Sequence, residues 1–164
     1  MDAPHGLGAI NAAFGDPRYL PPGKVSPAWE AAHMTLVRDF PLIPNGKLYV
    51  HKLIEAPLRQ ALEACAELGD GYHVHTIGCF APRAQRGSWG FLLSTHTWGI
   101  AVDINAQQNP LITECNLEDA RRRAPGARDI PDEWIAAFKA AGFFWGGDFS
   151  HRFDPQHFQF ASGY

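Results

Sequence analysis

The spacing of hydrophobic positions changes along the chain and predicts a mixture of strands and helices. In residues 47–54, KLYVHKLI, hydrophobic and polar side chains alternate as they do in a half-buried strand. In residues 56–69, hydrophobic side chains recur at helical spacing and a glycine follows as a stop signal. A second helix is predicted at 130–142, where Pro131 and two acidic residues suit the first turn and a glycine ends the pattern.

Other segments carry weaker patterns. Short strands are predicted at 72–80, 99–105, 143–149 and 157–160. Residues 1–27 are rich in glycine and proline, and we expect them to form an extended arm packed on a domain formed by residues 28–164. Residues 106–130 are polar, with one helical turn expected near 116–123. Strands and helices do not alternate regularly, so the predicted class is a small single α+β domain.

Composition and charge narrow the function. The chain has 164 residues, of which 46% are hydrophobic and 19% are charged, as in a globular domain with its own core. A net charge of −3 gives no general attraction to nucleic acid, and the run Arg121–Arg123 is interpreted as a solvated helix end. No apolar stretch reaches the roughly 18 residues of a membrane-spanning helix, so no membrane insertion is expected.

The cysteines and the N-terminus predict where the protein is made. The three cysteines, Cys65, Cys79 and Cys115, form no Cys-x-x-Cys pair and are expected to be reduced thiols. The first residues lack a basic start followed by an apolar run, which argues against a secretory signal. We therefore expect the protein to be made in the cytoplasm. We also expect it to be a monomer.

The segment STHTWGIAVDIN, residues 94–105, contains the most informative polar residues. Asp103 lies within an apolar strand pattern, and a buried carboxylate is costly unless it is paired or bound to a metal. His96 precedes it by seven residues, although a histidine taken alone is more often an ordinary surface or hydrogen-bonded residue. The later segment DPQHFQF adds Asp154 and His157. A hydrolytic zinc takes three protein ligands and leaves one position for water, which this set could supply; Asp154 before a proline could also merely start a turn.

A second histidine pair offers an alternative metal site. His73 and His75 are two residues apart on a predicted strand and therefore share one face. No carboxylate or third histidine lies near them in the sequence. We interpret them as residues that line a cleft or support other ligands.

Three motifs in the same order resemble those of the VanY-type zinc peptidases of bacterial cell walls. They are SxHxxGxAxDxN, GFxWGG and DxxHFQ, and the resemblance runs from GCFAPRAQRG at 78–87 to HFQF at 157–160. The family includes D-alanyl-D-alanine carboxypeptidases and the L-alanyl-D-glutamate endopeptidases of phage endolysins, and LGAINAAFGDPR near the N-terminus is similar to phage-encoded members. The resemblance implies the α+β fold shared with the hedgehog signalling domain, an antiparallel sheet with flanking helices.

The resemblance also implies the roles of individual residues. His96, Asp103 and His157 would be the Zn²⁺ ligands, and Asp154 would be the catalytic acid and base. Family members often have glutamate where this chain has Gln159 and tryptophan where it has Phe149, but neither change removes the proton-carrying acid.

The resemblance also implies roles for residues around the predicted zinc site. Arg83 would face the substrate or the developing oxyanion, with Arg86 as the alternative if the loop register differs. Ser94 would bind substrate or orient the site. Trp98 and Trp145 are interpreted first as structural residues that pack around the metal.

The implied function is a zinc-dependent peptidase that cleaves the stem peptides of peptidoglycan and acts on the cell wall after release. We interpret it as an endolysin-like L-alanyl-D-glutamate endopeptidase. One alternative is a D-alanyl-D-alanine carboxypeptidase. Another is a non-catalytic zinc-containing binding module, although the presence of Asp154 counts against it.

Overall fold

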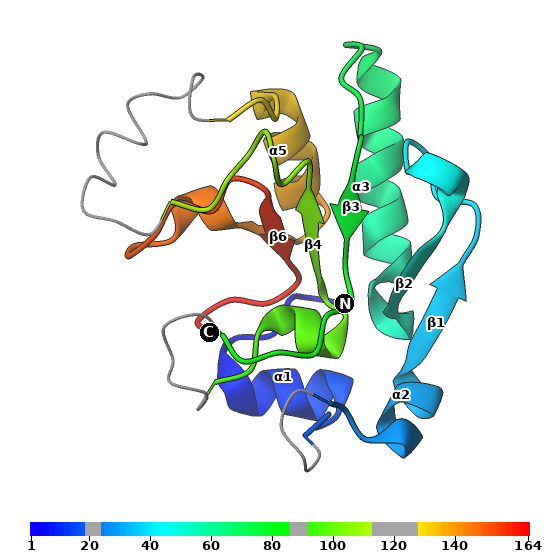
Figure 1. Ribbon diagram of the computed structural model, residues 1–164, viewed down its shortest axis with the longest axis vertical. Coiled ribbons are helices and arrows are strands. Elements are labelled where there is room, and N and C mark those ends of the chain that lie inside the picture. Colours follow the sequence, from blue (N-terminus) through cyan, green and yellow to red (C-terminus); the bar gives the residue numbers. More distant parts are fainter. Residues whose placement is uncertain (19–23, 86–91, 113–127) are drawn as a thin grey trace.

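The computed structural model describes residues 1–18, 24–85, 92–112 and 128–164, and its strands form two antiparallel sheets (Figure 1). The larger sheet has the order β3-β4-β6-β5, with β3 at Ile77–Gly78, β4 at Ala101–Ile104, β5 at Phe144–Trp145 and β6 at His157–Gln159. The smaller sheet pairs β1 (Met34–Val37) with β2 (Leu48–His51). This arrangement confirms the predicted α+β class with antiparallel sheets and flanking helices.

Two long helices pack against each other behind the larger sheet (Figure 1). They are α3 (Glu55–Leu68) and α5 (Asp132–Ala140), and both lie where the hydrophobic spacing predicted helices. The ring of Phe138 in α5 lies 4.3 Å from that of Phe158 in β6, centroid to centroid. This contact fixes one face of the sheet against the helices and leaves the other face for the polar residues.

The observed strands are shorter than the predicted ones. Of the predicted strand 72–80, only β3 forms, and the predicted strand 47–54 ends at His51, where a 3-10 turn at Lys52–Ile54 leads into α3. A strand at Met34–Val37 was not predicted, because its four residues alternate too briefly to stand out.

The N-terminal segment corrects the prediction of an extended arm. Residues Gly6–Phe14 form α1, and α2 begins at Pro27 and ends at His33. Ile10 and Phe14 are fully buried in the core. The glycines and prolines that suggested an extended arm are concentrated after α1, and the four-residue spacing of Ile10 and Phe14 was the helical signal.

The C-terminal end of α1 is held by three ring donors. Trp29 and His51 both donate to the carbonyl of Phe14, at 3.0 and 3.2 Å, and Trp98 donates to the carbonyl of Gly15 at 2.9 Å. Trp98 is completely buried. Its indole therefore joins the site-bearing segment to α1, which agrees with a structural role for Trp98.

The structure also bears on the predictions for the cysteines, for the segment near 116–123 and for membrane-spanning helices. Cys65 and Cys79 are buried free thiols, as predicted. The helical turn near 116–123, the run Arg121–Arg123 and Cys115 lie outside the described residues. In the described part of the chain, no helix is both long and apolar enough to cross a bilayer.

Candidate metal centre

The register of β4 and β6 brings two of the predicted ligands together. Asp103 and His157 are cross-strand partners, so their side chains project from the same face of the sheet. Their neighbours Val102 and Phe158 form the next pair and project to the opposite face. Asp103 Oδ1 lies 2.9 Å from His157 Nδ1.

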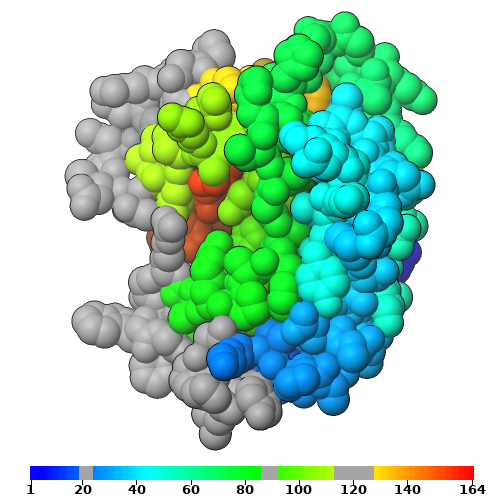
Figure 2. Space-filling view, turned by 45° about the vertical axis from the view of Figure 1, so that its right-hand side comes forward, coloured from blue at the N-terminus to red at the C-terminus, as the bar shows by residue number. Residues whose placement is uncertain are grey.

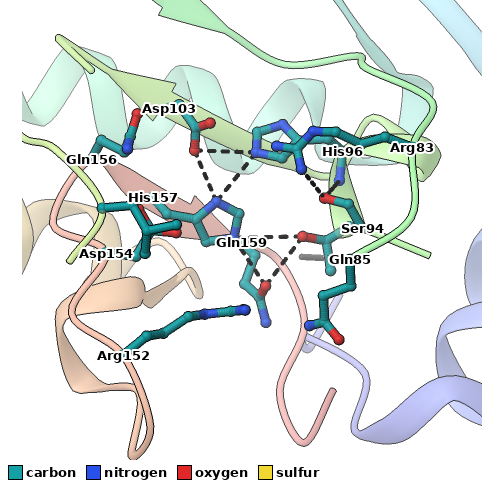
Figure 3. Close-up of a pocket in the computed structure, with 12 residues that line it drawn as sticks. Arg83, Gln85, Ser94, His96, Asp103, Arg152, Asp154, Gln156, His157 and Gln159 are labelled. Carbon is teal, nitrogen blue, oxygen red and sulfur yellow. Dashed lines mark hydrogen bonds and ion pairs between the residues drawn. The ribbon is translucent and has the colours of Figure 1, made fainter. Parts of the chain in front are cut away.

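His96 reaches the same point from a 3-10 turn, Thr95–Trp98, that precedes β4 (Figure 3). Its Nε2 lies 3.1 Å from Asp103 Oδ1 and 3.2 Å from His157 Nδ1. The chain leaves this turn through Gly99 at φ 64°, where an added Cβ would lie 2.4 Å from the side chain of Met34. Glycine suits this position because other side chains rarely adopt this left-handed backbone conformation, and the resulting turn places His96 next to β4.

Hydrogen bonds on the far side of each imidazole select the nitrogen that faces the centre. His96 Nδ1 lies 2.6 Å from the carbonyl oxygen of Cys79, which can only accept, so Nδ1 carries the proton. His157 Nε2 lies 3.0 Å from Gln159 Oε1, while the Gln159 amide nitrogen donates to Ala161. His96 Nε2 and His157 Nδ1 are thus the nitrogens with lone pairs for a ligand.

The three side chains fit a divalent metal ion. One ligand atom from each of His96, Asp103 and His157 lies within 4.8 Å of the others, and the two histidines are buried. Two neutral imidazoles and one carboxylate are a typical donor set for a hydrolytic metal. Within the described residues, this is the only such group of three or more histidine, cysteine, aspartate or glutamate side chains.

The electrostatics of the group agree with cation binding. Burial raises the pKa of the Asp103 carboxyl, but the close contacts with the His157 and His96 imidazoles outweigh burial and hold this pKa well below its ordinary value. Burial likewise lowers the pKa of His157, and the Asp103 carboxylate reverses that shift and raises it. Asp103 is therefore an ionised carboxylate that attracts positive charge to this point.

Asp154 lines the same pocket as the three ligands, and one of its carboxylate oxygens meets no donor of the described segments. Its buried Oδ1 has no hydrogen-bond partner among the described residues. Burial raises the pKa of the Asp154 carboxyl, and the charge of Asp103 adds to the rise, while His157 and Arg152 oppose it. A partly buried carboxyl with a raised pKa and an unmet acceptor suits exchange of a proton with a nearby water.

The segment after β5 holds Asp154 in place. An added Cβ on Gly146 would lie 2.4 Å from the carbonyl oxygen of Asp154 and 3.0 Å from Cβ of His157. Trp145 donates from its indole to the carbonyl of Pro155 at 2.8 Å. Trp145 therefore supports the loop next to the centre, and Gly146 allows that loop to approach.

Arg83 and Ser94 line the same pocket and contact each other. Arg83 Nη1 donates to Ser94 Oγ at 3.2 Å, and Ser94 Oγ also accepts from the backbone N–H of His96. Ser94 thus holds both the arginine and the turn that carries His96. Arg86 lies outside the described residues.

The pocket lies in a recess of the surface. Figure 2 shows residues of the red C-terminal segment at the bottom of this recess, between the yellow-green segment that follows β4 and the green segments before it. The described residues that line the pocket are Arg83, Gln85, Ser94, Thr95, His96, Asp103, Leu111, Arg152, Asp154, Gln156, His157 and Gln159.

Sequence reasoning missed some of these residues and considered others that lie elsewhere. Arg152 and Thr95 were not singled out, although both lie within two residues of a predicted site residue. His73 and His75 are exposed, with ring centroids 6.3 Å apart, and neither belongs to the ligand group or lines the pocket.

Comparison with known proteins agrees with this geometry. Residues 86–160 match the D-alanyl-D-alanine carboxypeptidase family. This segment carries a metallopeptidase-family domain. The match covers less than half of the chain but includes His96, Asp103, Asp154 and His157. It confirms the prediction that the protein is a metallopeptidase. Neither the curated proteins nor the solved structures include a match to this chain.

Proposed function

We propose that the protein is a zinc-dependent peptidase that cleaves the stem peptides of peptidoglycan. The observation that carries the proposal is the convergence of His96, Asp103 and His157 next to the unpartnered carboxylate of Asp154. All four residues lie in the segment that matches the D-alanyl-D-alanine carboxypeptidase family.

The donor set favours zinc among the divalent metals. Two imidazoles and one carboxylate leave a fourth position open, as hydrolytic zinc sites do. A zinc ion held there would polarise the scissile carbonyl and lower the pKa of the attacking water.

The protein's own residues would manage protons and charge. Asp154, with its raised pKa, takes the proton of the attacking water and passes it to the leaving amine. Arg83, held by Ser94, donates to the oxyanion that develops on the scissile carbonyl. Thr95 donates to Gln159 Oε1 at 3.2 Å and helps to keep His157 oriented.

Two bonds in the stem peptide are candidates. We propose the L-alanyl-D-glutamate bond, as in an endolysin-like endopeptidase that reaches the wall after release, because the motifs resemble those of such enzymes. The D-alanyl-D-alanine bond is the second candidate, and the description of the matched family favours it.

Digestion of purified peptidoglycan tests the proposal. The zinc-loaded protein should release fragments that mass spectrometry identifies, and a chelator should stop the release until zinc is restored. New N-terminal D-glutamate would show the endopeptidase, and free D-alanine would show the carboxypeptidase. If neither peptidoglycan nor synthetic stem peptides are cleaved with zinc bound, the proposed function is wrong.

A further inference from the structure

Arg152 is a second guanidinium in the pocket, and the mechanism above does not use it. It lies two residues before Asp154 and is half-buried. Figure 3 shows its side chain extending toward Gln159, on the opposite side of the pocket from Arg83 and Ser94.

An aromatic ring orients the Arg152 side chain. Its Cζ lies 4.6 Å from the centroid of the Phe149 ring. A guanidinium over a ring face keeps its N–H groups at the edge of its plane, where a planar acceptor with two oxygens can meet two of them. Arg152 is therefore partly ordered before any ligand arrives.

No carboxylate among the described residues pairs with those donors. Arg59 forms an ion pair with Asp39 at 2.8 Å, and Arg128 pairs with Asp132. By contrast, no ion pair or hydrogen bond joins Arg152 to any other described residue, and its attraction to Asp154 acts only at longer range.

The charge balance of the pocket leaves room for an anion. Its charged lining residues in the described part of the chain are Arg83, Arg152, Asp103 and Asp154. A divalent cation at the three ligands would offset both carboxylates and leave two guanidinium charges. Arg83 is assigned to the charge that develops during the reaction, so Arg152 remains for a charge that the substrate already carries.

The place of Arg152 indicates which part of the substrate carries that charge. Arg152 lies two positions before Asp154, the group that would protonate the leaving amine, and lines the same pocket, so we place it on the leaving-group side of the scissile bond. We infer that Arg152 binds a free carboxylate on the residue that directly follows the scissile bond. This inference rests on the proposed function and restricts it to one class of substrate.

Both candidate bonds present such a carboxylate. In the carboxypeptidase reaction it is the terminal carboxylate of the released D-alanine. In the endopeptidase reaction it is the α-carboxylate of a D-glutamate whose side-chain carboxyl continues the peptide. The shared chemistry is an α-carboxylate one residue beyond the cleaved bond, and paired substrates separate the two sources.

Four synthetic peptides test the inference with the zinc-loaded full chain. One pair is diacetyl-L-Lys-D-Ala-D-Ala and its C-terminal amide, and the other is L-Ala-γ-D-Glu-L-Lys and its α-amide. In the pair that the protein cleaves, Arg152→Gln should raise KM for the acid about 10- to 100-fold with little change in kcat. The same substitution should leave the amide, already a poor substrate for the unchanged protein, unaffected.

A matched control and a binding measurement complete the design. Arg38 is exposed and does not line the pocket, so Arg38→Gln should leave the preference for acid over amide intact. Calorimetry with the zinc-loaded Asp154→Asn protein should show tighter binding of the acid, and adding Arg152→Gln should abolish that difference.

The results separate this inference from the proposed function. If the Arg152→Gln protein still has a lower KM for the acid than for the amide, Arg152 does not bind the carboxylate. The same follows if the substitution raises KM equally for the acid and the amide. Neither result would contradict the proposed peptidase activity. If the unchanged zinc-loaded protein cleaves peptidoglycan but neither binds nor cleaves any of the four peptides, only the inference is overturned. If it cleaves neither the peptides nor peptidoglycan, both the inference and the proposed function are overturned.

Discussion

Individual hydrogen bonds decide which atoms of the candidate centre are available. Gln159 stands where related enzymes often have glutamate, yet its oxygen accepts from His157 because its amide nitrogen is held by Ala161. The neutral side chain therefore orients the imidazole as a carboxylate would, without adding negative charge. The substitution at this position is compatible with an intact centre.

Two substitutions should separate metal binding from proton transfer. His157→Ala should remove most of the zinc, because it deletes one of three ligands. Asp154→Asn should keep the zinc but lower turnover about 100- to 10,000-fold, the usual contribution of a general acid or base. Metal analysis and stem-peptide kinetics on the same preparations check both. Full zinc occupancy in His157→Ala, or near-normal turnover in Asp154→Asn, would contradict the assigned roles.

Gly146→Ala should damage the centre without touching a ligand. The new Cβ would lie 2.4 Å from the carbonyl oxygen of Asp154, so the loop that carries Asp154 and His157 must move. We expect weaker zinc binding and at least about 10-fold lower activity, since small displacements of catalytic groups reduce rates strongly.

Gly8→Ala provides the matched control for Gly146→Ala. Gly8 lies in α1, where an added Cβ meets no atom within 4 Å. Alanine there should leave zinc binding unchanged and stabilise the fold by about 0.5–1 kcal/mol. Equal activity of the two variants would show that the loop tolerates the displacement.

At the scale of elements, short strands near the centre depend on side chains that tie loops to them. Asn105 follows β4, is fully buried and has φ 48°. Its Oδ1 accepts from the backbone of His75 and Thr76, and its Nδ2 donates to Tyr72 and His73. These bonds replace the ladder that a longer β3 would have formed.

Asn105→Ala should therefore lower the free energy of unfolding by about 3 kcal/mol. The substitution leaves two partly buried N–H groups without an acceptor, each costing about 1–3 kcal/mol. Urea denaturation followed by tryptophan fluorescence measures the change. Gln107→Ala, at an exposed position two residues later, should have an effect within about 0.5 kcal/mol. Equal effects of the two substitutions would show that the Asn105 bonds contribute little.

At the scale of the whole molecule, α1 and β2 share a buried histidine. The ring of His51 is enclosed between Phe14 and Trp29, and only 1% of the residue is exposed. Burial lowers the pKa of His51 to about 4, and the positive charges of His33 and Lys52 add to the shift while the bond to Phe14 opposes it. The fold therefore favours the neutral imidazole.

This burial makes the stability of the protein depend on pH. In the unfolded chain the pKa of His51 returns to about 6.5, so between pH 6.5 and 4 the unfolded state binds more protons. The contribution of His51 is complete above pH 6.5 and is lost as pH falls to 4, by about 3 kcal/mol. Urea denaturation at a series of pH values measures it.

His51→Gln isolates this contribution. Glutamine keeps an N–H that can reach Phe14 but does not titrate, so the variant should lose less stability than the unchanged protein between pH 6.5 and 4. Contributions from the other histidines cancel in the comparison. If the free energy of unfolding falls equally in the two proteins between pH 6.5 and 4, His51 is not the group responsible for the pH dependence.

The sequence by itself was sufficient for the features that depend on local patterns. The helices α3 and α5 form where hydrophobic side chains recur at helical spacing, since such a face is buried wherever it packs. The residues His96, Asp103 and His157 offered the donor types of a hydrolytic zinc, and the resemblance of their motifs to VanY-type zinc peptidases indicated a metal-dependent peptidase. In α1 the helical signal was present but was outweighed by the glycines and prolines nearby.

The tertiary structure alone decided the features that depend on distant segments. Asp103 and His157 are separated by 54 positions and meet through the register of β4 and β6, which no local pattern encodes. Arg83 and Arg152 look alike as loop arginines, and only the fold brings both to one pocket, where Ser94 holds the first and the ring of Phe149 lies against the second. The physical reason is that packing and strand register bring residues together irrespective of their separation in the chain, whereas propensity and spacing act over only a few positions.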